Sequence, residues 1–253
     1  MTTYIQLRKF LRPVRTYFRV VRNRLRVHVA ELLNRPMVAH HGIERSGTNI
    51  LEASLQSFGI VTANGFLNDE DNVPGHKHFR IQADNSSVVM NPTHEHLWSP
   101  GTIQEYSENA GLSRTAKHIV IFKDPANWLV SINRYGAEAG WPGGGQILDD
   151  PVLRVSYLRE WSEYYKAWEV FAQAEPQLVL LVQYEVWMQD FAAGLQRIGD
   201  FVGVSGRLKK QSALDIKVYQ SGKRNSITFD INNPELAQSV YDEVTWNSFD
   251  RFN

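Results

Sequence analysis

One short run of the sequence combines glycine, arginine and hydroxyl residues at a spacing that suits phosphate binding. Residues 42–49 (GIERSGTN) follow an apolar run and precede a helical pattern, which predicts a strand-to-helix turn. The two glycines keep the spacing of a phosphate-binding loop, but Thr48 stands where a nucleotide triphosphatase has lysine. Backbone N–H groups at the helix start, with the Ser46 hydroxyl and the Arg45 guanidinium, favour an anion of phosphate or sulfate size. Plain helix capping is the alternative interpretation.

A second strand-to-helix turn carries another cation and another hydroxyl. His118 to Phe122 is rich in β-branched residues and predicts a buried strand. Asp124 is a favourable N-cap and Pro125 suits the first helical position, so a helix should begin there. Ser131 follows Lys123 by eight residues. The two side chains are therefore candidates for a second phosphate site.

The elements around these turns alternate between strands and helices. This alternation predicts an α/β fold, a P-loop-like three-layer sandwich with a mostly parallel central sheet, whose ligands bind at the carboxyl ends of the strands. A glycine-rich stretch, residues 136–145, should be an irregular loop that faces the acceptor, whereas the aromatic residues of 158–168 should be core. The other expected strands are 37–43, 87–90 and 178–182, and the other expected helices are 49–58, 187–202 and one that starts at 233.

In their order along the chain, these motifs resemble the family of sulfotransferases that depend on 3′-phosphoadenylyl sulfate (PAPS). Arg45 to Asn49 matches the family's loop for the 5′-phosphosulfate. Lys123-Asp124-Pro125 with Ser131 matches its site for the 3′-phosphate, and Tyr184-Glu185 matches the end of a later strand. The chain looks most like a bacterial branch with ERSGTN, KH and KDP..W..S..RY motifs. The resemblance covers roughly residues 37–203.

The resemblance implies in-line transfer of a sulfuryl group from PAPS to an acceptor hydroxyl, with PAP (3′,5′-adenosine bisphosphate) as product and no metal. A glycan or related metabolite is the favoured acceptor. Lys123 replaces the usual arginine and loses its planar fork. Ile50 replaces a tryptophan that contacts adenine in many members, so adenine stacking falls to Tyr184. The donor-binding residues implied are Arg45, Ser46, Gly47, Thr48, Asn49, Lys123, Ser131 and Tyr184, with Lys223 and Arg224 from a basic turn near the C-terminus.

Two side chains compete for the role of general base. His78 belongs to the KH pair of the resemblance, and histidine has the unperturbed pKa best suited to the task. Glu44, beside the first turn, is the alternative. His41 lies in a strand and should be packed rather than catalytic. The pair His94 and His96 could hold a metal, but exposed histidines near a helix start are more common, so we expect no metal site.

Two other functions would fit parts of the same pattern. A P-loop-like small-molecule kinase would share the first turn, although Thr48 argues against it, and it would bind ATP with magnesium. A non-catalytic nucleotide-binding or scaffold protein of the same fold would bind ligands without sulfuryl transfer.

The N-terminal segment differs in charge from the rest of the chain. The net charge is zero, yet nine of the 27 basic residues and a single acid, Glu31, precede residue 36. The remainder is therefore acidic, with 18 basic and 26 acidic residues. Apolar residues recur every three or four positions across residues 7–32, which predicts a basic amphipathic helix beginning near Pro13. We expect residues 1–35 to form this extension and residues 36–253 the sulfotransferase-like domain.

Three partners suit the amphipathic helix. Packing on the body or on a second subunit is the ordinary role of such a stripe and is favoured. Peripheral docking on an anionic membrane comes second. Nucleic acid is not expected, since few aromatic residues interleave the charges. No apolar run approaches the ~18 residues of a membrane span. Because the family's donor is made in the cytosol, the resemblance implies a cytoplasmic location, with or without a peripheral hold on the inner membrane face.

Overall fold

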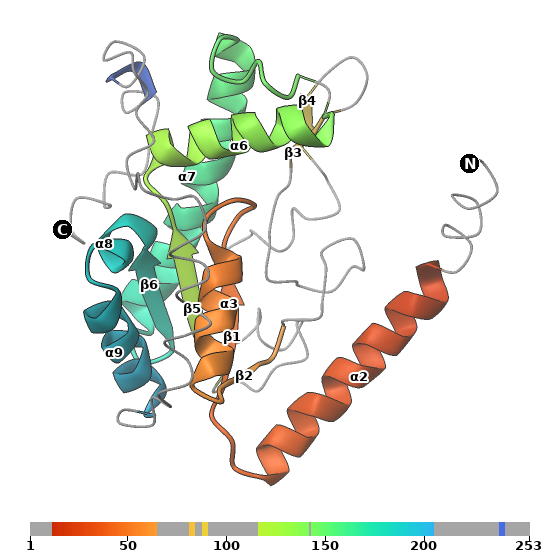
Figure 1. The fold of residues 1–253 in the computed structure, drawn as a ribbon, viewed down its shortest axis with the longest axis vertical. Helices are drawn as coiled ribbons and strands as arrows, with labels where there is room; N and C mark the ends of the chain where they lie inside the picture. The colour runs from red at the N-terminus through yellow and green to blue at the C-terminus, as the bar shows by residue number, and fades with distance from the viewer. Residues whose placement is uncertain are drawn as a thin grey trace.

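A computed structural model of the chain describes residues 12–64, 81–83, 88–90, 116–141, 143–204 and 238–240. Strands and helices alternate along most of it (Figure 1). The strands are β1 (Met37–His41), β2 (Val61–Thr62), β3 (Ile81–Ala83), β4 (Val88–Met90), β5 (Lys117–Phe122) and β6 (Val179–Gln183). The helices are α2 (Arg12–Leu32), α3 (Thr48–Ser57), α6 (Pro125–Ala139), α7 (Pro151–Ala174), α8 (Tyr184–Gln189) and α9 (Phe191–Val202).

The central sheet has four strands in the order β2-β1-β5-β6. All three of its strand pairs are parallel. β1 and β5 are neighbours, with His41 opposite Val120, so the two strands end at the same edge. The predicted α/β fold with a parallel sheet is confirmed.

Helices cover both faces of this sheet. Alternate residues of β5 serve two different cores, because successive strand side chains point to opposite faces. Ile119 and Ile121 pack with α3, α8 and α9 on one face. Val120 and Phe122 pack with α6 and α7 on the other. In Figure 1, α7 lies behind the sheet and α6 crosses its upper edge, where β5 ends.

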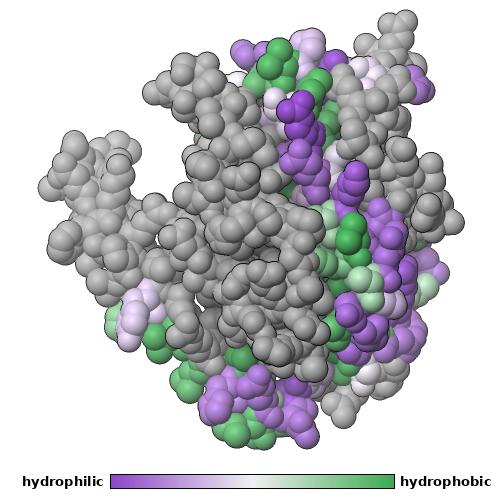
Figure 2. All heavy atoms as spheres, turned by 180° about the vertical axis from the view of Figure 1, so that it is seen from behind, coloured by the Kyte–Doolittle hydropathy of each residue, from purple (hydrophilic) through white to green (hydrophobic). Residues whose placement is uncertain are grey.

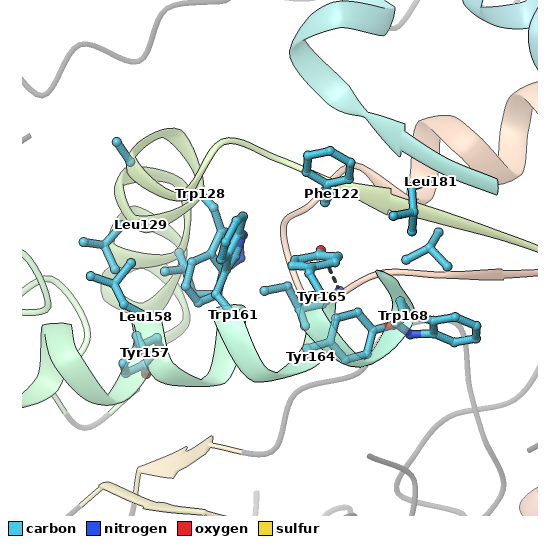
Figure 3. Packing of buried hydrophobic residues seen from close by; sticks show 14 of the residues in the cluster. Phe122, Trp128, Leu129, Tyr157, Leu158, Trp161, Tyr164, Tyr165, Trp168 and Leu181 are labelled. Atoms are coloured by element: carbon cyan, nitrogen blue, oxygen red, sulfur yellow. Dashed lines mark hydrogen bonds between the residues drawn. The ribbon is translucent and has the colours of Figure 1, made fainter. Parts of the chain in front are cut away.

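The core of α7 is a row of large aromatic side chains. Trp161, Tyr164 and Tyr165 are fully buried, and Trp168 is nearly so. Figure 3 shows these rings between α6 and the sheet, with edge-to-face contacts such as that of Trp161 on Tyr165. The prediction that this aromatic stripe is core is confirmed. The burial of these four large side chains stabilises the packing of α7 beneath both turns.

His41 is also a core residue, as predicted. It is fully buried, and its Nε2 lies 3.0 Å from Nδ1 of His118. Burial lowers the pKa of His118 to about 3, so this ring is neutral near pH 7. The ring of Trp168 lies against His41, at 4.5 Å between centroids. His41 and His118 therefore pack in the core, on β1 and β5, the strands that precede the two turns.

Several predicted boundaries were wrong for identifiable reasons. The expected helix 187–202 is two helices that meet at Asp190, which caps α9 by accepting from the Ala193 N–H. The expected loop 136–145 begins four residues late, because α6 continues to Ala139. Gly136 belongs to the helix, and its missing Cβ leaves room for the close approach of the Gly144 backbone. The short strand at 88–90 pairs antiparallel with β3 and is outside the main sheet.

Among the side chains of the N-terminal helix α2 that the structure describes, Val27 and Ala30 are buried. Val27 packs with Met37 and Ala39 of β1, Ala63 after β2 and Ala116 before β5. Arg26 donates to the Thr62 hydroxyl at 3.3 Å. The helix includes Arg12 and so begins one residue before the predicted Pro13. Among the described residues, no helix has the length and apolar composition that a membrane span requires.

Candidate functional site

The two predicted anion-binding turns lie side by side at one edge of the sheet. The first follows β1 and the second follows β5, its hydrogen-bonded neighbour. The backbone of Gly42 lies so close to Ile121 that a Cβ on the glycine would be 2.8 Å from the Ile121 carbonyl oxygen. The first turn therefore packs directly against the end of β5, the strand that leads into the second turn.

The first turn is shaped by two left-handed residues. Arg45 has φ 70° and Gly47 has φ 105°. Ser46 closes the turn between them, since its N–H and its hydroxyl both donate to the Ile43 carbonyl, at 3.2 and 2.7 Å. A left-handed arginine is uncommon, because its Cβ approaches the backbone. With this conformation, the Arg45 guanidinium and the N-terminus of α3 belong to one turn.

The start of α3 has a glycine at its N-cap position. Gly47 has no side chain, so within the described part of the chain the N-cap residue makes no capping hydrogen bond to the first turn of the helix. Thr48 is buried at the first helical position, and Asn49 after it is exposed. Uncapped N–H groups and the positive end of the helix dipole attract an anion. The backbone of residues 45–49 has the turn-to-helix form that the sequence predicted. Anion binding there stays a prediction.

Arg45 is held over an aromatic ring, with part of its guanidinium buried. Its Cζ lies 4.9 Å from the centroid of the Tyr135 ring, on α6. Its Nε is buried and has no hydrogen-bond partner among the residues that the structure describes. An N–H that is withdrawn from water and left unpaired is costly, so it marks a place for an acceptor oxygen. A phosphate or sulfate oxygen fits this requirement.

Both glycines of the first turn are needed for close packing. A Cβ on Gly42 would lie 2.4 Å from Oγ of Ser46. A Cβ on Gly47 would lie 2.7 Å from Cδ2 of Tyr184. The ring of Tyr184 therefore supports the turn from the side of β6.

Tyr184 also contacts the second turn. The Nζ atom of Lys123 lies 4.6 Å from the centroid of its ring, and both residues are buried. A buried ammonium over an aromatic face is favourable, but it needs further acceptors. Tyr184 thus joins the first turn to Lys123, and its predicted stacking on adenine stays untested.

The second turn is capped and braced by carboxylates. Asp124 accepts from the N–H groups of Ala126 and Asn127, as its predicted role as N-cap requires. Glu185 accepts from the Asp124 N–H at 3.1 Å and from the Asn127 side-chain amide at 3.0 Å. Burial raises the pKa of Glu185, and the charge of Asp124 adds to the rise, against the lowering by these hydrogen bonds.

Three aromatic donors fix the backbone of both turns from below. Trp128 Nε1 donates to the Glu44 carbonyl at 2.8 Å, and Trp161 Nε1 donates to the Lys123 carbonyl at 3.1 Å. The Tyr165 hydroxyl donates to the Ile121 carbonyl at 3.0 Å, and burial raises the pKa of this phenol. Figure 3 labels all three side chains. Both turns are therefore tied to the core by hydrogen bonds.

Ser131 lies on α6 between Trp128 and Tyr135, the two residues that contact the first turn. Its side chain is buried, with 2% of the residue exposed. Positions three and four apart share one helix face, so Ser131 lies on the side of α6 that meets the turns. Its contact with a 3′-phosphate stays a prediction.

Some predicted residues lie outside the described part of the chain. They are His78, the preferred general base, and the basic pair Lys223 and Arg224. The histidines considered for a metal, His94 and His96, lie outside it as well. Glu44, the alternative base, is in the first turn and half-buried. Among the described residues, no group of His, Cys, Asp and Glu could hold a metal ion.

Sequence reasoning assigned no role to Tyr135 or Glu185, although both belong to the quoted motifs. Tyr135 supports Arg45, and Glu185 braces the second turn. Tyr135 could have been found from the sequence, because it follows Ser131 by one helical turn. Glu185 could not, because its partner Asp124 lies 61 residues away.

A scan against models of protein families and a search of curated proteins gave no match. Among solved structures, the chain is similar to the mouse sulfotransferase SULT7A1 in complex with PAP, with 14% sequence identity. The alignment covers 81% of each chain, with a TM-score of 0.45.

Proposed function

We propose that the protein is a sulfotransferase that binds PAPS across the two turns and transfers its sulfuryl group to an acceptor hydroxyl. One observation carries the proposal. An uncapped helix start beside a buried, unpartnered arginine N–H adjoins a second cationic turn, on the neighbouring strand. A nucleotide with a phosphate at each end of its ribose would satisfy both turns at once.

Arg45 and the N–H groups that begin α3 would hold the 5′-phosphosulfate. In the transfer, the S–O bond to the 5′-phosphate breaks and a new S–O bond forms to the acceptor oxygen. Negative charge then grows on the 5′-phosphate, where the guanidinium and helix dipole are placed to stabilise it. A general base, His78 or Glu44, would take the hydroxyl proton.

Lys123 and Ser131 would hold the 3′-phosphate. Lys123 is a buried point charge whose ammonium lies over the Tyr184 ring. No lysine is present at the Thr48 position to grip a γ-phosphate, and Thr48 is buried. The residues of the site therefore favour a sulfuryl donor over a nucleoside triphosphate. A glycan-like acceptor remains part of the proposal, on the strength of the family resemblance.

The test is a transfer assay with radiolabelled PAPS and a panel of hydroxyl acceptors, for wild type and Arg45→Gln. We expect sulfated product from at least one acceptor, and a loss in kcat/KM of about 10²–10³ in the variant, as for one lost oxyanion donor. Arg134→Gln is the matched control, since Arg134 is an exposed arginine of the adjoining helix α6. Phosphate transfer from MgATP, with no PAP binding, would contradict the proposal.

A further inference from the structure

The outward side of α2 presents a continuous apolar stripe. Phe18 is 65% exposed, Leu25 62% and Leu32 72%. These residues follow each other at seven-residue steps, which keeps them on one side of a helix. Val27 and Ala30, which are buried, lie on the opposite side. The stripe also includes Tyr17, Val21 and Val29, and Leu33 follows the last residue of the helix.

The stripe is long and stands apart from the body of the protein. From Tyr17 to Leu32 it spans about 22 Å along the helix axis. In Figure 1, the N-terminal half of α2 extends away from the sheet and its helices. Figure 2 shows green apolar side chains of this helix next to purple polar ones, at the lower left of the molecule. Isolated apolar residues are common on surfaces, but a contiguous row marks an interaction site.

The charges of α2 decide between the candidate partners. The helix contains six arginines and one acid, Glu31. Pairing the stripe with the same stripe of a second copy would bring two such basic helices together, which repels. An anionic surface instead attracts the arginines and accepts the apolar side chains. Nucleic acid would use the arginines and leave the stripe in water.

We propose that α2 docks through this stripe on the surface of a bilayer that contains anionic phospholipid, with the helix axis parallel to the membrane plane. The apolar side chains enter the boundary between headgroups and acyl chains, and flanking arginines such as Arg22 contact lipid phosphates. The remainder of the chain is acidic, so it is repelled from the same surface and faces the solvent. This orientation would hold the enzyme beside the membrane without a spanning segment.

The test is flotation of the full-length protein with vesicles of phosphatidylcholine alone or mixed with phosphatidylserine. We expect binding to the mixed vesicles only, and less binding as salt is raised. The double variant Phe18→Gln/Leu25→Gln should bind at least about tenfold more weakly, since both side chains lose their burial in lipid. Arg22→Gln should bind about fivefold more weakly.

The control is Val152→Gln/Val170→Gln, which removes two exposed apolar residues from α7 and should leave flotation unchanged. Thermal unfolding shows whether each variant is folded. We expect both double variants to fold, because all four substituted positions are exposed. Equal binding to neutral vesicles would contradict the anionic surface. Absence of vesicle binding would contradict docking altogether. Sedimentation equilibrium would then show whether the wild type is a dimer that dissociates in the Phe18→Gln/Leu25→Gln variant. In that case the partner of the stripe is a second copy of the chain and not a membrane.

Discussion

The helices α3 and α6 both begin at the same edge of the sheet, but their first turns are satisfied in opposite ways. Asp124 caps α6 with its own carboxylate, and Glu185 braces that turn. At α3, Gly47 provides no side chain, and the cation of Arg45 precedes it in the same turn. A helix start that the protein has capped is structural, whereas one left open beside a cation is available to a ligand.

The largest expected effect comes from filling the open turn. Gly47→Ala places a Cβ against Tyr184 at a positive φ, so we expect a loss of about 2–4 kcal/mol in unfolding free energy. PAP affinity should fall more than a hundredfold in the protein that remains folded. Gly59→Ala is the control, because it has a similar φ with nothing within 4 Å.

Gly59→Ala isolates the cost of the left-handed backbone, about 1–2 kcal/mol, and should leave PAP affinity unchanged. Urea unfolding and calorimetric titration measure the two effects. Equal effects of the two substitutions on affinity would show that the close approach at Gly47 has no part in binding.

The capped turn should respond mainly in stability. Asp124→Ala removes two hydrogen bonds from the start of α6 and should lower the unfolding free energy by about 1 kcal/mol. Asp150→Ala is matched to it, since Asp150 caps α7 with the same two bonds. Both variants should lose similar stability in urea, and only Asp124→Ala should weaken PAP binding. If Asp150→Ala also weakened PAP binding, the weaker binding of Asp124→Ala would follow from its lower stability alone.

The brace of the capped turn predicts a pH dependence. The pKa of Glu185 is raised above its ordinary 4.5, mainly by burial, so the folded protein keeps this proton to a higher pH than the unfolded chain. Between the two pKa values, stability falls as pH rises, by up to about 1.4 kcal/mol per pH unit.

Glu185→Gln should flatten this part of the profile, measured by urea unfolding at a series of pH values above 4.5. One of the two hydrogen bonds accepted by Glu185 is lost in the variant, because glutamine has a single acceptor oxygen. An unchanged slope would assign the pH dependence to another group.

The smallest expected effect is that of a simple anion on the open turn. Inorganic phosphate at its dissociation constant should raise the unfolding free energy of wild type by about 0.4 kcal/mol. Arg45→Gln should remove this gain, while Arg134→Gln should keep it. Thermal unfolding with and without phosphate measures the difference. Equal stabilisation of both variants would place the anion elsewhere.

The parts of the site that the sequence predicted correctly are those that local chemistry determines. The Asp-Pro pair predicts the start of α6, and the glycine spacing predicts the turn after β1, because each depends on residues adjacent in the chain. The break at Asp190 was missed since apolar residues keep their helical period across it. The brace of Asp124 by Glu185 was missed because it depends on how β5 and β6 pair.

The helix α2 shows the same limit. Its basic amphipathic pattern was evident from the sequence, but the sequence favoured packing of the stripe on the body or a second subunit. The structure buries the opposite side, through Val27 and Ala30, and Val27 packs with residues of and next to the sheet. Which side of an amphipathic helix a protein buries depends on the shape of the surface that receives it.

The account rests on one nucleotide reaching both turns, and a ligand-by-residue cycle tests this directly. Calorimetry would compare PAP, adenosine 5′-monophosphate and adenosine 3′-monophosphate on wild type, Arg45→Gln and Ser131→Ala. We predict that Arg45→Gln weakens PAP about 10- to 100-fold but leaves the 3′-monophosphate unaffected, and that Ser131→Ala spares only the 5′-monophosphate. If each substitution weakens all three ligands equally, the two turns do not bind opposite ends of one ligand.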